Sequence, residues 1–166
     1  MEQRELKCTF TGHREEKLGE NWNEYSNECI ELKERIAEAV SDVYASGVQY
    51  FICGMAEGCD LYFAEAVLEL KQNHPDIRLE AAIPYAGQAK RWRASLIRRY
   101  ENILRLCDVK TVLQEHYSSD CMMRRNCYMV DNSSVLIAVY NGSPGGTRNT
   151  LLYAMRSGLE IIEIEI

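Results

Sequence analysis

The sequence predicts a three-layer, Rossmann-like α/β fold in which a mostly parallel sheet carries helices on both faces. Short apolar segments alternate along the chain with longer segments whose apolar residues recur at helical spacing. Several apolar segments are continuous, which is typical of parallel strands buried on both faces. Two of them lead through glycine-rich turns, at 53–60 and 140–147, into predicted helices. Because the 166 residues contain no linker, repeat or low-complexity segment, we expect one domain over residues 1–166.

The first half of the chain contains three predicted strands and two predicted helices. Residues 12–27 are polar and irregular, whereas from Cys29 to Val43 apolar residues recur every three or four positions, as in an amphipathic helix. Gly47 closes that helix, and Pro75 ends the next helical segment. In order, we expect a strand at 6–11, a helix at 29–43, a strand at 48–53, a helix at 61–71 and a strand at 79–83.

The second half continues the alternation after Pro84, which stops the third strand. Ser118 or Ser119 is placed to cap a short helix that carries Arg124 and Arg125. At the C-terminal end isoleucines alternate with glutamates, as in a strand with one exposed face. In order, we expect a helix at 89–103, a strand at 109–113, the short helix, a strand at 135–140, a helix at 147–157 and a strand at 162–166.

Composition indicates a cytoplasmic protein with reduced cysteines. No segment reaches the ~20 consecutive apolar residues that span a bilayer, and the charged residues 1–5 lack the apolar core of a signal peptide. The seven cysteines are odd in number and include no C-x-x-C pair. We interpret them as structural thiols and predict no metal site, with zinc or a disulfide as the alternatives. Cys59, inside a glycine-rich turn, is the candidate for reactivity.

The charge balance favours a small anionic ligand over a nucleic acid. A net charge of −6 argues against binding a polyanion, which needs a basic surface. Thirteen of the nineteen basic residues are nevertheless arginines, whose planar guanidinium suits phosphate and carboxylate groups. Arg14, Arg124, Arg125 and Arg148 lie beside predicted loops. We therefore expect a phosphate-bearing small molecule as the partner, with no membrane contact.

The carboxyl ends of the predicted strands define the candidate binding site. In an open α/β sheet, ligands bind at this edge beside the switch in strand order. A glycine-rich turn before a helix leaves main-chain N–H groups free at a positive helix end, which suits phosphate, and glycine lets a ligand approach the main chain. We expect ligand contacts from Gly12, His13, Arg14, Gly54, Met55, Glu57, Gly58, Asp60, Pro84, Gln88, Trp92, Arg124, Arg125, Asn126, Gly145, Gly146, Thr147 and Thr150.

Several of these residues also have a purely structural interpretation. Asp60 either caps the helix that begins beside it or binds ribose hydroxyls. Glu57 is either an exposed loop acid or the candidate for a catalytic carboxylate or a ribose ligand. Trp92 either stacks on a base or packs into the core. Residues 12–14 either contact a base and a phosphate or form an exposed turn, and residues 124–126 form either an anion clamp or a solvated helix face.

These motifs resemble those of the YpsA-like family in the SLOG superfamily, which is named after the DNA-processing protein DprA and the cytokinin-activating LOG hydrolases. The resemblance covers nearly the whole chain and rests on TGHR at 11–14, GMAEGCD at 54–60, IPY at 83–85 with Gln88 and Trp92, RRN at 124–126, YMVDNS at 128–133 and GGT at 145–147. It implies a Rossmann-like sheet that binds nucleotides or nucleotide-derived ligands, some members being hydrolases and others apparent sensors.

One motif departs from the pattern of the LOG hydrolases, P-G-G-x-G-T-x-x-E, whose glutamate assists cleavage of an N-glycosidic bond. Here residues 144–146 are followed directly by Thr147, and the position of the glutamate falls on Leu152 or on Thr150, depending on the alignment. The phosphate-binding part of the motif is therefore retained, whereas its carboxylate is missing.

The sequence thus predicts a ligand-sensing module that binds a nucleotide or a ligand of the NAD or ADP-ribose type. One alternative is a hydrolase or transferase that acts on a nucleoside N-glycosidic bond, with Glu57 as the replacement carboxylate. A less favoured alternative is a single-stranded DNA binder that resembles DprA. The terminal strand could pair across a dimer, so a homo-oligomer is compatible with the sequence.

Overall fold

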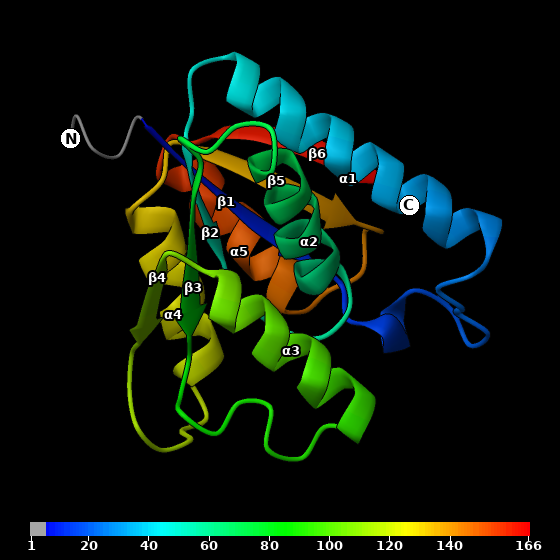
Figure 1. Cartoon of the computed structure of the whole chain (residues 1–166). Coiled ribbons are helices and arrows are strands. Elements are labelled where there is room, and N and C mark those ends of the chain that lie inside the picture. The colour runs from blue at the N-terminus through cyan, green and yellow to red at the C-terminus, as the bar shows by residue number, and fades with distance from the viewer. Residues whose placement is uncertain (1–5) are drawn as a thin grey trace.

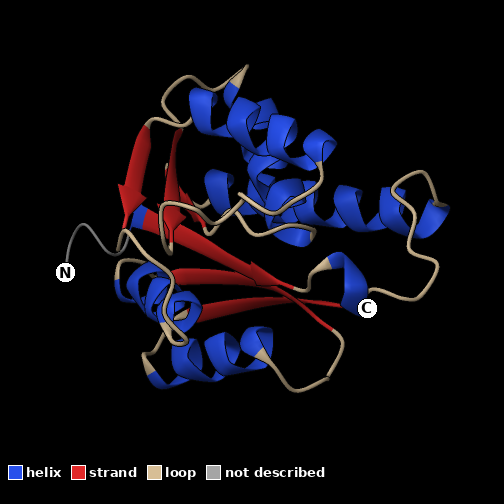
Figure 2. Ribbon diagram, turned by 90° about the horizontal axis from the view of Figure 1, so that it is seen from below, coloured by secondary structure: helices blue, strands red, loops and turns tan. Residues whose placement is uncertain are grey.

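The computed structural model describes residues 6–166 and places a six-stranded sheet between two layers of helices (Figure 1 and Figure 2). The strand order is β4-β3-β2-β1-β5-β6, and every neighbouring pair is parallel. The three-layer Rossmann-like prediction is therefore confirmed, with a sheet that is wholly parallel. The strands are β1 (Lys7–Gly12), β2 (Tyr50–Cys53), β3 (Arg78–Ile83), β4 (Val109–Val112), β5 (Val135–Tyr140) and β6 (Glu160–Glu165).

The helices divide between the two faces of the sheet, as Figure 2 shows. Three cover one face: α1 (Asn27–Ala45), α2 (Cys59–Lys71) and α3 (Ala94–Leu106). Two cover the other face: α4 (Cys121–Asp131) and α5 (Gly146–Arg156). A short 3-10 turn, η2 (Glu15–Lys17), follows β1.

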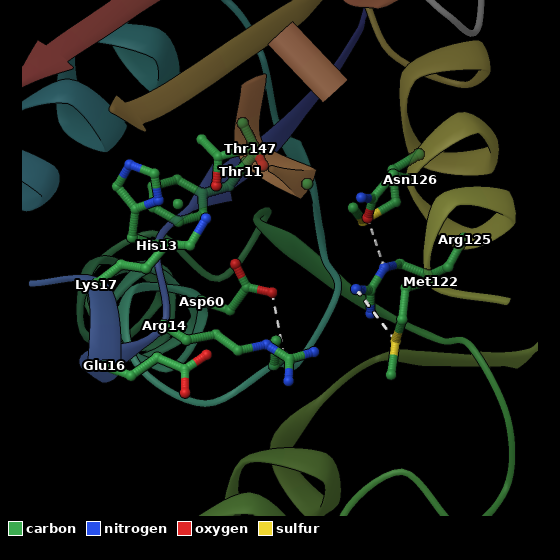
Figure 3. Close-up of a pocket in the computed structure, with 15 residues that line it drawn as sticks. Thr11, His13, Arg14, Glu16, Lys17, Asp60, Met122, Arg125, Asn126 and Thr147 are labelled. Atoms are coloured by element: carbon green, nitrogen blue, oxygen red, sulfur yellow. Dashed lines mark hydrogen bonds between the residues drawn. The ribbon is translucent and has the colours of Figure 1, made fainter. Parts of the chain in front are cut away.

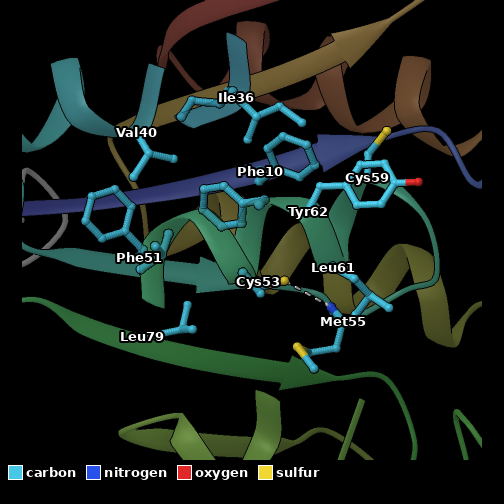
Figure 4. Close-up of a cluster of buried hydrophobic side chains, with 14 of the residues drawn as sticks. Phe10, Ile36, Val40, Phe51, Cys53, Met55, Cys59, Leu61, Tyr62 and Leu79 are labelled. Atoms are coloured by element: carbon cyan, nitrogen blue, oxygen red, sulfur yellow. Dashed lines mark hydrogen bonds between the residues drawn. The ribbon is translucent and has the colours of Figure 1, made fainter. Parts of the chain in front are cut away.

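Alternating strand residues supply the two apolar cores. On the face of α1 and α2, the core includes Phe10 of β1 (Figure 4). The Phe10 ring stacks on Phe63 of α2, with ring centroids 4.7 Å apart. On the opposite face, Leu136 of β5 packs with Leu151 of α5. Since neighbouring residues of a strand point to opposite faces, continuous apolar strands are needed to fill both cores.

The order of strands changes direction between β1 and β5. From β1 the chain steps outward through β2 and β3 to β4, and then returns to place β5 on the other side of β1. The pair is in register at Gly12 and Val139. The connections that leave β1 and β5 therefore diverge toward opposite faces, which opens a crevice at their carboxyl ends.

Two predicted helix starts are wrong. The helix expected from residue 89 begins at Ala94, because residues 85–92 form successive turns in which the N–H of Trp92 donates to the carbonyl of Ala89 at 3.0 Å. The short helix begins at Cys121, and its N-cap residue is Asp120 rather than Ser118 or Ser119; the Asp120 side chain makes no capping hydrogen bond.

The expected absence of a signal peptide concerns residues 1–5, which lie outside the described residues. In the part of the chain that the structure describes, no helix is both long and apolar enough to cross a membrane.

Candidate functional site

A cavity of about 270 Å³ lies at the carboxyl ends of β1 and β5, where the strand order changes (Figure 3). The turn after β1, both glycine-rich turns and one side of α4 contribute to its wall. The lining residues are Phe10, Thr11, Gly12, His13, Arg14, Glu16, Lys17, Ala56, Asp60, Met122, Arg125, Asn126, Met129, Gly146 and Thr147. The structure thus brings together three segments that the sequence placed at one edge of the sheet.

Two glycines allow the turn after β1 to pack against the turn after β2. A Cβ on Gly12 would lie 2.7 Å from the Cβ of Cys59. A Cβ on Gly58, whose φ is +86°, would lie 2.9 Å from the main-chain nitrogen of Glu15. Between the turns, the N–H of Cys59 donates to the carbonyl of His13 at 3.3 Å. These glycines therefore serve the approach of two main-chain segments to each other.

His13 connects the turn after β1 to the loop after β5. Its imidazole is buried, and its Nε2 accepts a hydrogen bond from the main-chain N–H of Asn141 at 3.1 Å. Burial and the nearby charge of Lys17 lower the pKa of His13 below its usual value. The ring is therefore neutral near pH 7, with its proton on Nδ1 and available to a ligand.

Arg125 is a buried cation in the cavity wall, with 4% of its surface exposed. Its Nη1 donates to the carbonyl of Gly54, and its Nε donates to Oδ1 of Asn126 at 2.8 Å. Nε2 of Gln88 donates to the same Gly54 carbonyl at 3.2 Å. Arg125 and Gln88 thus hold the end of β2 in place, and Asn126 orients the guanidinium.

Asp60 is a buried carboxylate that faces the cavity from the first turn of α2 (Figure 3). Its Oδ2 accepts the N–H of Ala56 at 3.0 Å, which closes the turn in which Met55 has a φ of +60°. Burial raises the pKa of Asp60, whereas the charges of Arg125 and Arg14 lower it. Its Oδ1 makes no hydrogen bond within residues 6–166 and remains available on the cavity side.

The N-terminus of α5 contributes main-chain N–H groups. Its cap residue, Gly145, has a φ of +140° and offers no side-chain cap, so the N–H groups of Gly146 and Thr147 have no capping side chain. Nζ of Lys17 donates to the carbonyl of Pro144 at 2.8 Å and contacts Gly145. A positive helix end and a lysine ammonium therefore meet at the rim of the cavity.

Besides Glu57, Gln88 and Trp92, seven of the residues proposed as ligand contacts lie outside the cavity wall: Gly54, Met55, Gly58, Pro84, Arg124, Gly145 and Thr150. Met55 and Pro84 are buried. Thr150 is also buried, and its hydroxyl donates to the carbonyl of Gly146 at 2.9 Å within α5. Arg124 is exposed and donates to Oε1 of Gln114 at 3.2 Å. Of the two adjacent arginines, Arg125 alone lines the cavity.

Glu57, the candidate catalytic carboxylate, is half-buried and is absent from the cavity wall. The carboxylates that do line the cavity are Asp60 and Glu16. Gln88 and Trp92 line a neighbouring cavity, which is described below.

The expected ligand contacts did not include seven residues of the cavity wall: Phe10, Thr11, Glu16, Lys17, Ala56, Met122 and Met129. The two methionines stand three positions before and four positions after Arg125 on α4, and residues at these spacings share a helix face. This spacing could have identified them once Arg125 was chosen. The contact between Lys17 and Pro144 joins segments 127 residues apart and has no local sequence signal.

The expectation that Cys59 is reactive is wrong. Its thiol is fully buried, and burial raises its pKa far above the usual value, which disfavours the reactive thiolate. All seven cysteines are free. Among the described residues, no three histidine, cysteine or acidic side chains are grouped so that they could hold a metal ion.

The fold and the cavity define a Rossmann-like α/β protein whose candidate site lies at the strand switch. The chain belongs to the YspA SLOG family (YpsA), whose family model matches residues 8–161. It is similar to the "Uncharacterized SPbeta prophage-derived protein YoqJ" of Bacillus subtilis, with 32% identity over 143 residues, 78% of this chain and 84% of that protein. A UPF0398 protein of Halalkalibacterium halodurans is 27% identical over 141 residues, 84% of this chain and 74% of the relative.

Among solved structures, DNA processing protein A (DprA) from Streptococcus pneumoniae has a similar fold, with a TM-score of 0.62 and 15% sequence identity. The match covers 97% of this chain and 50% of the DprA chain, so this chain spans half of that protein's length. At this identity the likeness shows the fold alone.

Proposed function

We propose that this protein is a ligand-sensing module that binds a nucleotide or a nucleotide-derived ligand in the cavity between β1 and β5. The observation that carries the proposal is the convergence of three recognition elements on one cavity: an uncapped helix N-terminus, cationic side chains and a buried carboxylate. A helix N-terminus and cationic side chains bind phosphate groups, and a carboxylate accepts hydrogen bonds from ribose hydroxyls. A nucleotide carries both kinds of group close together.

The phosphate is expected at the N-terminus of α5, where it would accept the N–H groups of Gly146 and Thr147. Arg14 is exposed, and its side chain makes no hydrogen bond or ion pair within the described residues, so its guanidinium is free to pair with the phosphate. Lys17 would exchange the Pro144 carbonyl for a phosphate oxygen.

The remaining wall fits a nucleoside. Oδ1 of Asp60 can accept a ribose hydroxyl, and Nδ1 of His13 can donate to a ring or sugar oxygen. Met122 and Met129 supply a polarisable apolar surface for a planar base. Nucleotides are intracellular metabolites, and thiols stay reduced in the cytoplasm. A nucleotide ligand and seven free cysteines therefore both support a cytoplasmic location.

Binding without turnover is favoured because no glutamate replaces the one in the LOG pattern. Thr150 is bonded within α5, Leu152 has an apolar side chain, and Glu57 is absent from the cavity wall. One observation favours a hydrolase as the second candidate. Burial raises the pKa of Asp60, which is the direction that a general acid for a departing base requires, and its carboxyl lines the cavity.

Mass spectrometry of small molecules retained by the natively purified protein tests the proposal. We expect a compound that contains a phosphate and a nucleoside, and calorimetry with that compound should confirm saturable binding. Retention of no such compound, together with no heat of binding for nucleotides, would overturn the proposal. Chromatography of the free base then separates the two candidates, because a sensor leaves the bound compound intact and a hydrolase releases base over many turnovers.

A further inference from the structure

We infer that the ligand is of the dinucleotide type, with two ring-bearing halves joined by a pyrophosphate, and that its second half occupies a second cavity beside the first. This inference rests on the proposed function and assigns the ligand class. The second cavity has a volume of about 520 Å³ and is lined by Arg14, Tyr85, Gly87, Gln88, Lys90, Arg91, Trp92, Glu115, His116, Tyr117 and Met122.

The two cavities meet at Arg14 and Met122, which line both of them. Figure 3 shows the Arg14 side chain extending past Asp60 toward the side of Met122. Pockets for drug-sized molecules measure about 300–1,000 Å³. The first cavity, at about 270 Å³, lies below that range, whereas the second lies within it. A ligand larger than one compact nucleotide would therefore extend past Arg14.

Three aromatic side chains in the wall of the second cavity, Tyr85, Trp92 and Tyr117, provide surfaces on which a planar ring can stack. Tyr85 and Tyr117 meet edge to face, with centroids 5.6 Å apart and an interplanar angle of 78°. Trp92 is half-buried and is held edge to face by the buried Tyr100, with centroids 5.3 Å apart. Exposed aromatic faces held by neighbouring rings are the surfaces on which nucleic-acid bases stack.

The charges of the second cavity favour an anionic ligand. Arg14, Lys90 and Arg91 contribute cations to its wall, while Glu115 contributes the carboxylate. Since Arg14 stands where the cavities join, its guanidinium is placed to pair with phosphates that link the two halves of the ligand.

Calorimetry on the full chain tests the inference with the four ribonucleoside 5′-monophosphates and the four matching symmetric dinucleoside pyrophosphates. The informative variant is Tyr117→Ala, because Tyr117 is 66% exposed and its truncation leaves the core intact. Tyr117→Phe restores the ring without the hydroxyl. Tyr25→Ala is the matched control, because Tyr25 is 90% exposed and lies outside both cavities.

We expect at least one dinucleoside pyrophosphate to bind more tightly than its mononucleotide by about fivefold or more, the lower end of what one stacked base contributes. Tyr117→Ala should remove most of this advantage and leave mononucleotide affinity unchanged, whereas Tyr117→Phe and Tyr25→Ala should keep the advantage. Mononucleotide binding with no advantage for the dinucleotide, or an advantage that survives Tyr117→Ala, would overturn this inference and leave the proposed function standing. Absence of binding for all eight compounds would overturn both.

Discussion

The guanidinium of Arg125 lies against the main chain of Gly54, and its Nη1 donates a hydrogen bond to the Gly54 carbonyl. A Cβ built on Gly54 would lie 2.8 Å from Cζ of Arg125. Gly54 follows β2 and Arg125 belongs to α4, so this contact joins the helix to the carboxyl edge of the sheet. It thereby fixes one wall of the candidate site.

Gly54→Ala should destabilise the fold by about 1–3 kcal/mol, the range for overpacking a tight site. The new methyl group would displace the Arg125 guanidinium, which can move only by giving up its buried hydrogen bonds. Gly146→Ala is the control, because a Cβ there meets open space and φ is not positive. Urea denaturation measures both free energies of unfolding. Equal free energies of unfolding for the two variants would show that the contact between Gly54 and Arg125 leaves room for a methyl group.

Replacing Arg125 should affect the fold as well as the ligand. Arg125 is buried, and its guanidinium anchors the main chain of Gly54. We expect Arg125→Met to lower the free energy of unfolding by about 1.5–3 kcal/mol, the range for hydrogen bonds to charged groups. The adjacent and exposed Arg124→Met should change it by less than about 0.5 kcal/mol. Thermal or chemical unfolding of the pair provides the check.

Arg14→Ala should weaken binding of a phosphate-bearing ligand by about 1.5–3 kcal/mol, since it removes a charge-assisted hydrogen bond. Stability should be unchanged, because the Arg14 side chain is exposed and, among residues 6–166, makes no hydrogen bond to a core residue. Arg148→Ala removes another exposed arginine, which lines neither cavity, so the ligand affinity of this variant should match that of the wild type. Calorimetry with the retained compound compares the three proteins. Equal affinities would place Arg14 on a solvated surface with no role in binding.

Stability should fall in mild acid through His13. The folded state lowers the pKa of this imidazole, so below its ordinary value of 6.5 the unfolded chain binds the proton more readily than the native protein. The stabilisation is therefore complete above that pH and is lost progressively as pH falls. The free energy of unfolding is measured at about pH 7.5 and about pH 5.5, on either side of the ordinary histidine pKa. The decrease between these two pH values should be smaller in His13→Gln than in the wild type. Identical losses in the two proteins would contradict this assignment.

Much of the fold could be predicted, because continuous apolar strands and helical spacing are local signals. The apolar segments 48–53 and 135–140 predicted two strands, and the sheet contains them as Tyr50–Cys53 and Val135–Tyr140. The start of α3 could not be predicted in this way. Ala89 and Trp92 have helical spacing, yet Trp92 belongs to a turn and packs edge to face on Tyr100.

The candidate site was predicted at the level of segments rather than side chains. The carboxyl-end rule brought Gly12, Asp60 and Gly146 to one cavity, because it depends only on parallel strands and their order. The choice between Arg124 and Arg125 depends on the rotation of α4 against the sheet, which adjacent residues do not reveal. Glu57 illustrates the same limit, since its neighbour Ala56 lines the cavity and Glu57 does not.

The central claim is that a nucleotide-type ligand binds between β1 and β5, and an amide chemical-shift titration of the 19.1 kDa protein tests it most directly. The four ribonucleoside monophosphates are added in turn to the uniformly ¹⁵N-labelled protein. We predict saturable shifts centred on the amides of Gly12, Ala56, Gly146 and Thr147, which border the cavity from three separate segments. Shifts centred elsewhere, or no shifts with any of the four compounds, would contradict the account.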